Sequence, residues 1–108
     1  MLEPGGPAAV FAALGDPVRL LLIERLKSGM EPPIGEIGGN LPVTRQAVAK
    51  HVAVLEASGL VEIRRHGRER RVRLKPAALS AASRYLDQVA RSWDDALGRL
   101  QAHLEEPA

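Results

Sequence analysis

The sequence predicts a mainly helical α+β fold, with about five helices and one two-stranded β-hairpin. Three observations support this prediction. Apolar residues recur at helical spacing through the first half of the chain, alternate strictly with polar residues between 61 and 74, and return to helical spacing in a long final segment. The chain has 108 residues, which suits one domain, so we expect residues 1–108 to form a single domain.

Two helices are predicted before residue 28. An Ala-rich apolar segment, 7–14, forms the first helix, and Gly15 ends it. Asp16 is suited to cap a second helix, and Pro17 suits its first position. This helix should run to about residue 27, and residues 28–33 should form a loop. The predicted buried stripe of the second helix consists of Val18, Leu21, Leu22, Ile23 and Leu26.

A short helix and a longer one follow, separated by only a few residues. Residues 34–39 form a weak helix because three glycines lower its stability. Thr44 caps the next helix, which runs to about residue 58 and is closed by Gly59. This spacing is typical of a helix-turn-helix, whose second helix can lie in the DNA major groove. With the hairpin that follows, the predicted fold is a winged helix-turn-helix.

The second of these two helices has the side chains needed to read DNA. If its apolar residues (Val48, Val52 and Leu55) face the core, the opposite face is polar or small. Arg and Lys can donate to guanine, Gln can pair with adenine, and Ala leaves room for close approach to the bases. A capping hydroxyl and first-turn N–H groups can hold a phosphate. The predicted DNA contacts are Thr44, Arg45, Gln46, Ala49, Lys50 and His51, the last being either a phosphate contact or a half-buried packing residue.

The turn of the predicted hairpin is strongly basic and reads RHGRERR over residues 65–71. In a winged helix this element lies along the DNA backbone or enters the minor groove. Residues 44–75 contain nine basic and three acidic residues, a net charge of +6, whereas the rest of the chain has a net charge of −4. This asymmetry indicates a polyanionic partner, double-stranded DNA. The predicted phosphate contacts are Arg65, Arg68, Arg70 and Arg71.

The final helix, predicted over 76–106, carries a longer apolar stripe than the core of one small domain needs. Its apolar residues from Leu79 to Leu104 follow one another in steps of three, four or seven, close to a heptad seam. The first helix adds apolar residues with no obvious partner inside the domain. Soluble monomers avoid large apolar patches, so we expect segments 7–14 and 76–106 to form a two-fold homodimer. The predicted interface residues are Val10, Phe11, Leu14, Leu86, Val89, Trp93, Leu97 and Leu100.

Composition excludes several function classes. The chain has no cysteine, which excludes disulfides, thiolate metal sites and a cysteine nucleophile. The adjacent carboxylates Asp94 and Asp95 diverge by about 100° on a helix, and no nucleophile is evident beside them, so we expect no enzyme activity and no cofactor. No apolar run is long enough to cross a membrane, and residues 1–6 do not resemble a signal peptide. We therefore expect a cytoplasmic protein.

Three segments resemble the arsenical-resistance-repressor (ArsR) family of bacterial regulators. They are residues 11–19 (FAALGDPVR), 44–52 (TRQAVAKHV) and 55–61 (LEASGLV), and the similarity extends over about residues 8–104. The blocks Leu-Gly-Asp-Pro-x-Arg and His-x-x-x-Leu-x-x-x-Gly-Leu-Val are specific in combination. The resemblance implies a winged-helix homodimer that represses promoters, and some members of the family release DNA when they bind metal.

The chain departs from the family's metal-binding motifs in two places. Residues 34–38 (IGEIG) stand where soft-metal sensors carry Cys-x-Cys. A second sensor type uses Asp-x-His followed by His-x-x-Glu on the last helix, but here residues 90–92 are ARS, and only His103 and Glu106 match the second half. We therefore expect no metal site and a member of the family's non-metal-sensing branch.

Two alternatives to a repressor remain open. A winged-helix module can bind an acidic protein through its wing, but the seven basic residues within 64–75 and the polar second helix favour DNA. A regulator of this type can also sense an unidentified ligand at its dimer interface, although no convergent polar groups define a pocket in the sequence.

Overall fold

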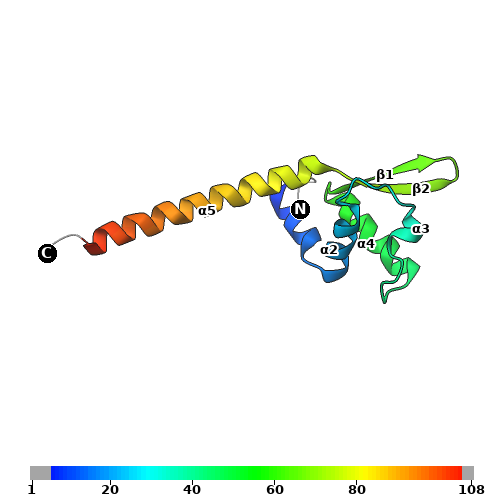
Figure 1. Ribbon diagram of the computed structural model, residues 1–108, viewed down its shortest axis with the longest axis horizontal. Coiled ribbons are helices and arrows are strands. Elements are labelled where there is room, and N and C mark those ends of the chain that lie inside the picture. Colours follow the sequence, from blue (N-terminus) through cyan, green and yellow to red (C-terminus); the bar gives the residue numbers. More distant parts are fainter. Residues whose placement is uncertain (1–5, 106–108) are drawn as a thin grey trace.

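The computed structural model describes residues 6–105 and confirms a mainly helical fold with a hairpin wing (Figure 1). Helices α1 to α4 form a cluster beside the hairpin, and the long helix α5 leaves this cluster from the end of the hairpin. The elements, in chain order, are α1 (Pro7–Leu14), α2 (Pro17–Leu26), α3 (Ile34–Ile37), α4 (Arg45–Ala57), β1 (Val61–His66), β2 (Glu69–Leu74) and α5 (Pro76–Glu105).

Short-range signals fix most of the helix boundaries. A carboxylate oxygen of Asp16 accepts a hydrogen bond from the Arg19 backbone N–H at 3.0 Å and caps α2. The Thr44 hydroxyl oxygen accepts from the Ala47 N–H at 3.0 Å and caps α4. Gly59, with φ of +88°, reverses the chain after α4. Helix α3 ends at Ile37, two residues before the predicted end, because the glycines that follow form a turn.

The wing is an antiparallel hairpin with the predicted alternation of faces. Val61 pairs with Leu74 and Ile63 with Val72, and all four side chains turn toward the core or its edge. The segment before α3, predicted as a plain loop, instead extends the sheet: the Val72 N–H donates to the Pro32 carbonyl at 3.0 Å, and Pro33 forms a bridge with Arg71. This third chain segment holds β2 on its outer side.

The core is aliphatic and joins all the helices to the hairpin. Leu22, Leu26, Leu55, Leu60 and Val72 are among its fully buried side chains. Burial of this kind stabilises a fold by about 25 cal/mol for each Å² of apolar surface removed from water.

Two predicted placements are wrong. Val10 is 0% exposed and belongs to the core of its own domain, so it does have a partner there, and it cannot contact a second copy directly. Leu21 is 47% exposed because Leu22 and Leu26, one turn apart, define the buried face of α2, and Leu21 is rotated about 100° away from Leu22.

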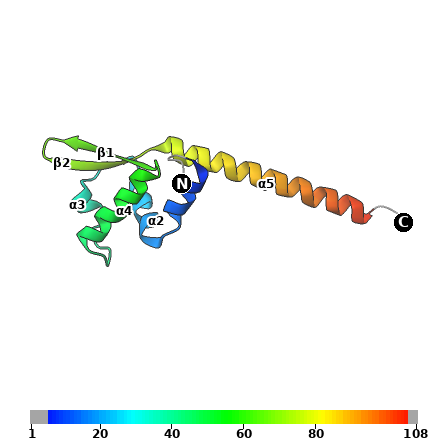
Figure 2. The same ribbon diagram turned by 180° about the vertical axis from the view of Figure 1, so that it is seen from behind.

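Helix α5 projects far from the rest of the domain (Figures 1 and 2). Its first turns pack on α1, and Ala78 and Ala82 in these turns are buried. The described chain measures 73 × 29 × 26 Å, and α5 provides most of the long dimension. Glu106, the predicted last residue of this helix, lies outside the described residues. Within 6–105, no helix is both long and apolar enough to cross a membrane.

Candidate nucleic-acid interface

Helix α4 exposes a polar face on the side opposite its core contacts. Val48, Val52 and Leu55, the residues expected to face the core, are buried. The predicted DNA-contacting residues of this helix that lie exposed are Thr44, Arg45, Gln46, Ala49 and Lys50. The Thr44 hydroxyl accepts the capping bond with its oxygen, so its O–H remains available as a donor to a phosphate.

The turn that presents α4 is held by an arginine that sequence reasoning missed. One guanidinium nitrogen of Arg25 on α2 donates to the Ile37 carbonyl at 2.7 Å and to the Gly39 carbonyl at 2.6 Å. The α carbon of Gly38 packs closely on Val48 of α4, and a side chain at this position would overlap Val48 Cγ2. The bonds from Arg25 hold the end of α3 and the following turn on α2, and the close packing of Gly38 on Val48 holds this turn against α4.

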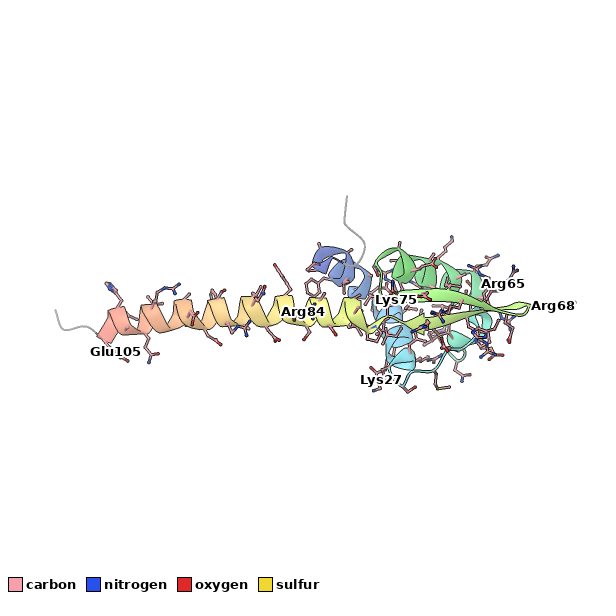
Figure 3. All side chains as sticks on the ribbon, turned by 90° about the horizontal axis from the view of Figure 1, so that it is seen from above. Lys27, Arg65, Arg68, Lys75, Arg84 and Glu105 are labelled. Atoms are coloured by element: carbon pink, nitrogen blue, oxygen red, sulfur yellow. The ribbon has the colours of Figure 1, made fainter. Side chains whose placement is uncertain are left out.

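The end of the hairpin carries three arginines without an ion-pair partner among residues 6–105. Arg65 pairs across the strands with Arg70, and strand alternation puts both on the face that is continuous with the core-facing residues. Arg68 lies in the turn beside Gly67, whose φ of +62° suits a glycine. Figure 3 shows Arg65 and Arg68 toward the tip of the hairpin, while α5 extends in the opposite direction.

Arg71 differs from these three arginines because its side chain lies on the other face of the hairpin. It is half-buried, it donates to the Glu31 carbonyl at 3.3 Å, and it pairs with the Glu69 carboxylate at 3.0 Å. The predicted phosphate contact for Arg71 therefore conflicts with the observed side chain, which binds the segment before α3. The alternating charges of the hairpin sequence did not reveal this difference, because it depends on Glu31, 40 residues earlier.

The outer face of the hairpin also carries a pair of opposite charges. Arg64 donates through Nε to Glu62 at 2.5 Å. This hydrogen bond lowers the pKa of the Glu62 carboxyl and raises the pKa of the Arg64 guanidinium. The pair thus neutralises charge on the face away from α4, and Arg65 and Arg70 remain on the other face, unpaired within the described chain.

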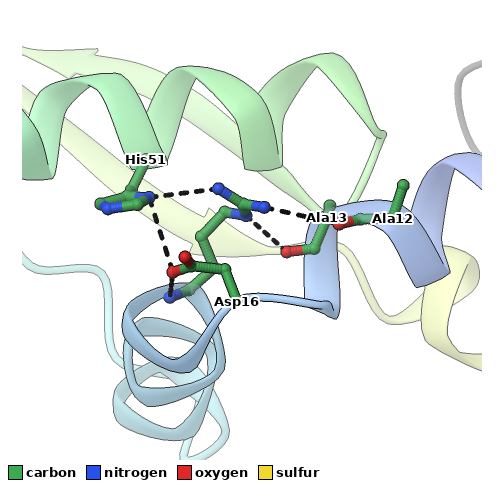
Figure 4. A network of polar contacts seen from close by, with 5 residues as sticks. Ala12, Ala13, Asp16 and His51 are labelled. Carbon is green, nitrogen blue, oxygen red and sulfur yellow. Dashed lines mark hydrogen bonds and ion pairs between the residues drawn. The ribbon is translucent and has the colours of Figure 1, made fainter.

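His51 faces the start of α2 instead of solvent (Figure 4). Its Nδ1 atom lies 3.3 Å from a terminal guanidinium nitrogen of Arg19 and 3.8 Å from the Asp16 carboxylate. The hydrogen bond from the Arg19 backbone N–H lowers the pKa of the Asp16 carboxyl, and the positive charge of the Arg19 side chain lowers it further. Of the two sequence-based alternatives for His51, the half-buried packing position is the one that the structure shows.

Comparison with known proteins agrees with this architecture. No family model matches the chain. It is 38% identical over 91 residues to a protein of Mycobacterium tuberculosis named HTH-type transcriptional regulator Rv2034, and the match covers 84% of this chain and 81% of that protein. It also superimposes on a solved structure named ArsR-like transcriptional regulator from Rhodococcus sp. RHA1, with a TM-score of 0.78 and 37% identity over 94% of each chain.

The chain belongs to the ArsR family of transcriptional regulators. It is therefore a DNA-binding regulator and not an enzyme. A more distant structure has the same fold: the homodimeric winged helix-turn-helix DNA-binding domain Mb0332 from Mycobacterium bovis, described as a possible ArsR-family transcriptional regulator. It is 26% identical, with a TM-score of 0.59, and the match covers 85% of this chain and 82% of that one.

This ArsR-family chain leaves one face of α5 uncovered. Phe11 and Leu14 of α1 are half-buried, and the Phe11 ring packs on Tyr85 with ring centroids 6.0 Å apart. Beyond Ala82, the apolar stripe has no covering element among the described residues. Its exposed members are Leu86, Val89, Trp93, Leu97, Leu100 and Leu104.

The described residues offer no cluster of metal ligands, and the cations around the cavity beside α2 are paired with carboxylates. Within 6–105, no three His, Cys, Asp or Glu side chains gather in a cluster able to hold a metal ion, and Glu106 lies outside that range. A cavity of about 390 Å³ lies between the end of α2 and the hairpin. Its cations have carboxylates beside them: Lys27 has Glu24, Arg64 has Glu62, and Arg73 lies 3.8 Å from Glu31.

Proposed function

We propose that this regulator is a homodimeric repressor that binds an inverted-repeat operator in double-stranded DNA. The observation that carries the proposal is that the proposed DNA-binding elements and the proposed dimer helix lie at opposite ends of the molecule. Helix α4 and the hairpin, with Arg65 and Arg68 toward the hairpin tip, lie at one end, and α5, which carries the exposed apolar residues, extends from the other (Figures 1 and 3).

Helix α4 supplies the sequence-specific contacts in this proposal. Arg45 and Lys50 donate to guanine edges, and Gln46 pairs with adenine in the major groove. Ala49 has no polar atom in its side chain and permits close approach to the bases. Thr44 and the first-turn N–H groups hold a phosphate at the helix N-terminus, which fixes how α4 enters the groove.

The hairpin supplies the sequence-independent contacts. Arg65, Arg68 and Arg70 lack carboxylate partners in the described chain, so binding a phosphate does not require them to break an ion pair. Each neutralised phosphate releases condensed counterions, which makes binding depend on salt. Arg71 and His51 are left out of the proposed contacts because their side chains are bound elsewhere in the domain.

The proposed dimer covers the stripe on α5. Six large apolar side chains exposed along one helix form a patch of a size that soluble monomers avoid. A two-fold pairing through Leu86, Val89, Trp93, Leu97 and Leu100, with Phe11 and Leu14 of α1 at its edge, removes these five side chains of the stripe from water. The homodimeric relative from M. bovis supports this arrangement. Two α4 helices then face half-sites about one DNA turn, or a multiple of it, apart.

The proposed regulator represses transcription and does not respond to metal. A dimer bound across two half-sites occupies the promoter surface that polymerase needs, which agrees with the repression implied by the family resemblance. The missing Cys-x-Cys and Asp-x-His motifs support assignment to the non-metal-sensing branch.

Two substitutions test the DNA-binding proposal. Lys50→Ala should change the sequences selected from a random duplex library and lower affinity for the wild-type site by about 1–3 kcal/mol for the lost base contact. Arg68→Ala should weaken binding to all sequences alike and reduce the salt slope by about 1 per copy. Lys27→Ala, which removes an exposed cation away from both surfaces, serves as the control and should change neither property.

An opposite pattern would support a different function. If the purified protein selects no duplex but retains a partner with an acidic surface, and this retention depends on Arg68, the chain is a protein-interaction module and the proposed function is wrong.

A further inference from the structure

The side chain of Arg19 extends from α2 and contacts both α1 and α4, at Ala12, Ala13 and His51 (these three are labelled in Figure 4). Its Nε donates to the Ala13 carbonyl at 2.6 Å and one terminal nitrogen donates to the Ala12 carbonyl at 3.4 Å, both at the C-terminal end of α1. The other terminal nitrogen lies 3.3 Å from His51 Nδ1 on α4. The backbone of Arg19 belongs to α2, where its N–H is fixed by Asp16.

The three elements joined by Arg19 have different roles in the proposed function. Helix α1 packs on α5 through the Phe11 and Tyr85 rings, and together they form the surface proposed for the dimer. Helix α4 carries the proposed base-reading residues. The last carbonyls of a helix lack partners within that helix and favour a cation, so the guanidinium suits the end of α1 electrically as well as sterically.

We infer that Arg19, acting through His51, is a positioning residue that sets the distance between the two α4 helices of the dimer and therefore the half-site spacing of the operator. This inference rests on the proposed function. Arg19 touches no proposed base or phosphate contact, and it fixes α4 relative to the dimer surface through a planar group with donors on two sides.

The geometry makes spacing a sensitive readout. With half-sites one turn apart, each α4 lies roughly 17 Å from the two-fold axis. A shift of each α4 by only about 1.7 Å along the DNA changes the distance between the two helices by about 3.4 Å, the rise of one base pair. A small loss of positional definition at Arg19 is thus comparable to a change of one base pair in the spacer.

Two variants of Arg19 separate the effect of its contacts with both α1 and α4 from the effect of its positive charge. Arg19→Lys keeps the positive charge, but a single ammonium group does not reach the α1 carbonyls and His51 together in the way the guanidinium does. Arg19→Met removes the charge while keeping an unbranched apolar stem. Lys27→Met, at the end of the same helix, removes a charge with no link to α1 or α4 and is the matched control.

The experiment measures affinity for duplexes that contain the half-site selected by the wild-type protein. The probes are inverted repeats with the selected spacer, the same repeats with the spacer changed by one or two base pairs in either direction, and a single half-site. Circular dichroism and thermal unfolding establish that each variant is folded. We expect wild type and Lys27→Met to prefer one spacer by about tenfold or more, and both Arg19 variants to bind the altered spacers within about threefold of the original. Affinity for the single half-site should stay within about twofold of wild type.

The outcomes distinguish this inference from the function on which it rests. If the folded Arg19→Lys protein keeps the wild-type spacer preference, the positioning role is overturned. A uniform loss of affinity that includes the single half-site also overturns it, since that result indicates general support of α4. If wild type binds no inverted repeat, the proposed function itself has failed.

Discussion

Replacing Trp93 with alanine tests the proposed dimer surface quantitatively. A tryptophan side chain presents roughly 150–250 Å². Trp93 is 65% exposed in the single chain, so about 100–160 Å² remains for a partner to cover. At about 25 cal/mol for each Å², complete coverage would stabilise the dimer by about 2.5–4 kcal/mol for each copy of the side chain.

A dimer contains two copies of Trp93, and coverage is incomplete. If the partner covers half of the exposed area, the two losses together are still about 2.5–4 kcal/mol, which raises the dimer Kd roughly 100- to 1000-fold. Operator affinity should fall with it, because two unlinked α4 helices no longer bind as one unit. Sedimentation over a range of concentrations measures the first effect, and fluorescence anisotropy with labelled operator measures the second.

Leu20→Ala is the matched control for this experiment. Leu20 is 51% exposed on α2 and lies off the α5 stripe, so the substitution should leave the dimer Kd unchanged. If the folded Trp93→Ala protein dimerises like wild type, or if wild type is a monomer at micromolar concentration while binding its operator, the dimer surface has been assigned wrongly.

Three further predictions concern stability and metal response. Gly38→Ala should lower the free energy of unfolding by about 1–3 kcal/mol, measured by chemical denaturation, because the new methyl would overlap Val48 Cγ2. Gly35→Ala is the control and should not lower it, because its added methyl meets nothing within 4 Å. The pKa of the Asp16 carboxyl is lowered in the folded protein, so the ionised carboxylate stabilises the fold above its ordinary pKa of 3.8, and this stabilisation is lost as the pH falls through the lower folded value. Asp16→Asn should therefore reduce the loss of stability at acid pH in a plot of unfolding free energy against pH, and an unchanged acid limb would contradict this. Zinc should not release the protein from DNA, and a stoichiometric zinc complex with altered DNA affinity would contradict the expectation and direct attention first to His103.

The sequence predicted those features that depend on neighbouring residues. Asp16, Thr44 and Gly59 mark helix ends through contacts within a few positions, and the alternation of apolar residues in the hairpin determines which face meets the core. These signals were sufficient for the element order and for the exposed face of α4. Their success has a physical cause: caps and periodicity act over one or two turns of chain.

Contacts between residues far apart in the sequence could not be predicted from local patterns. Arg71 resembles Arg70 in sequence, but the carbonyl of Glu31 binds only the former. Arg19 and His51 are 32 positions apart, and no local pattern in the sequence links them. Val10 was assigned to the dimer surface because its partners in the core come from elements that follow much later in the chain.

The most direct test of the central claim is the salt dependence of operator binding by the wild-type protein. A dimer that places Arg65, Arg68 and Arg70 of each copy on phosphates makes six such contacts through the wings alone, so log K should fall with log salt with a slope of about −5 or steeper. The duplex would be selected from random sequence and measured between low and physiological salt. A slope near zero, or no binding to any selected duplex, would contradict a role in DNA recognition for α4 and the wing.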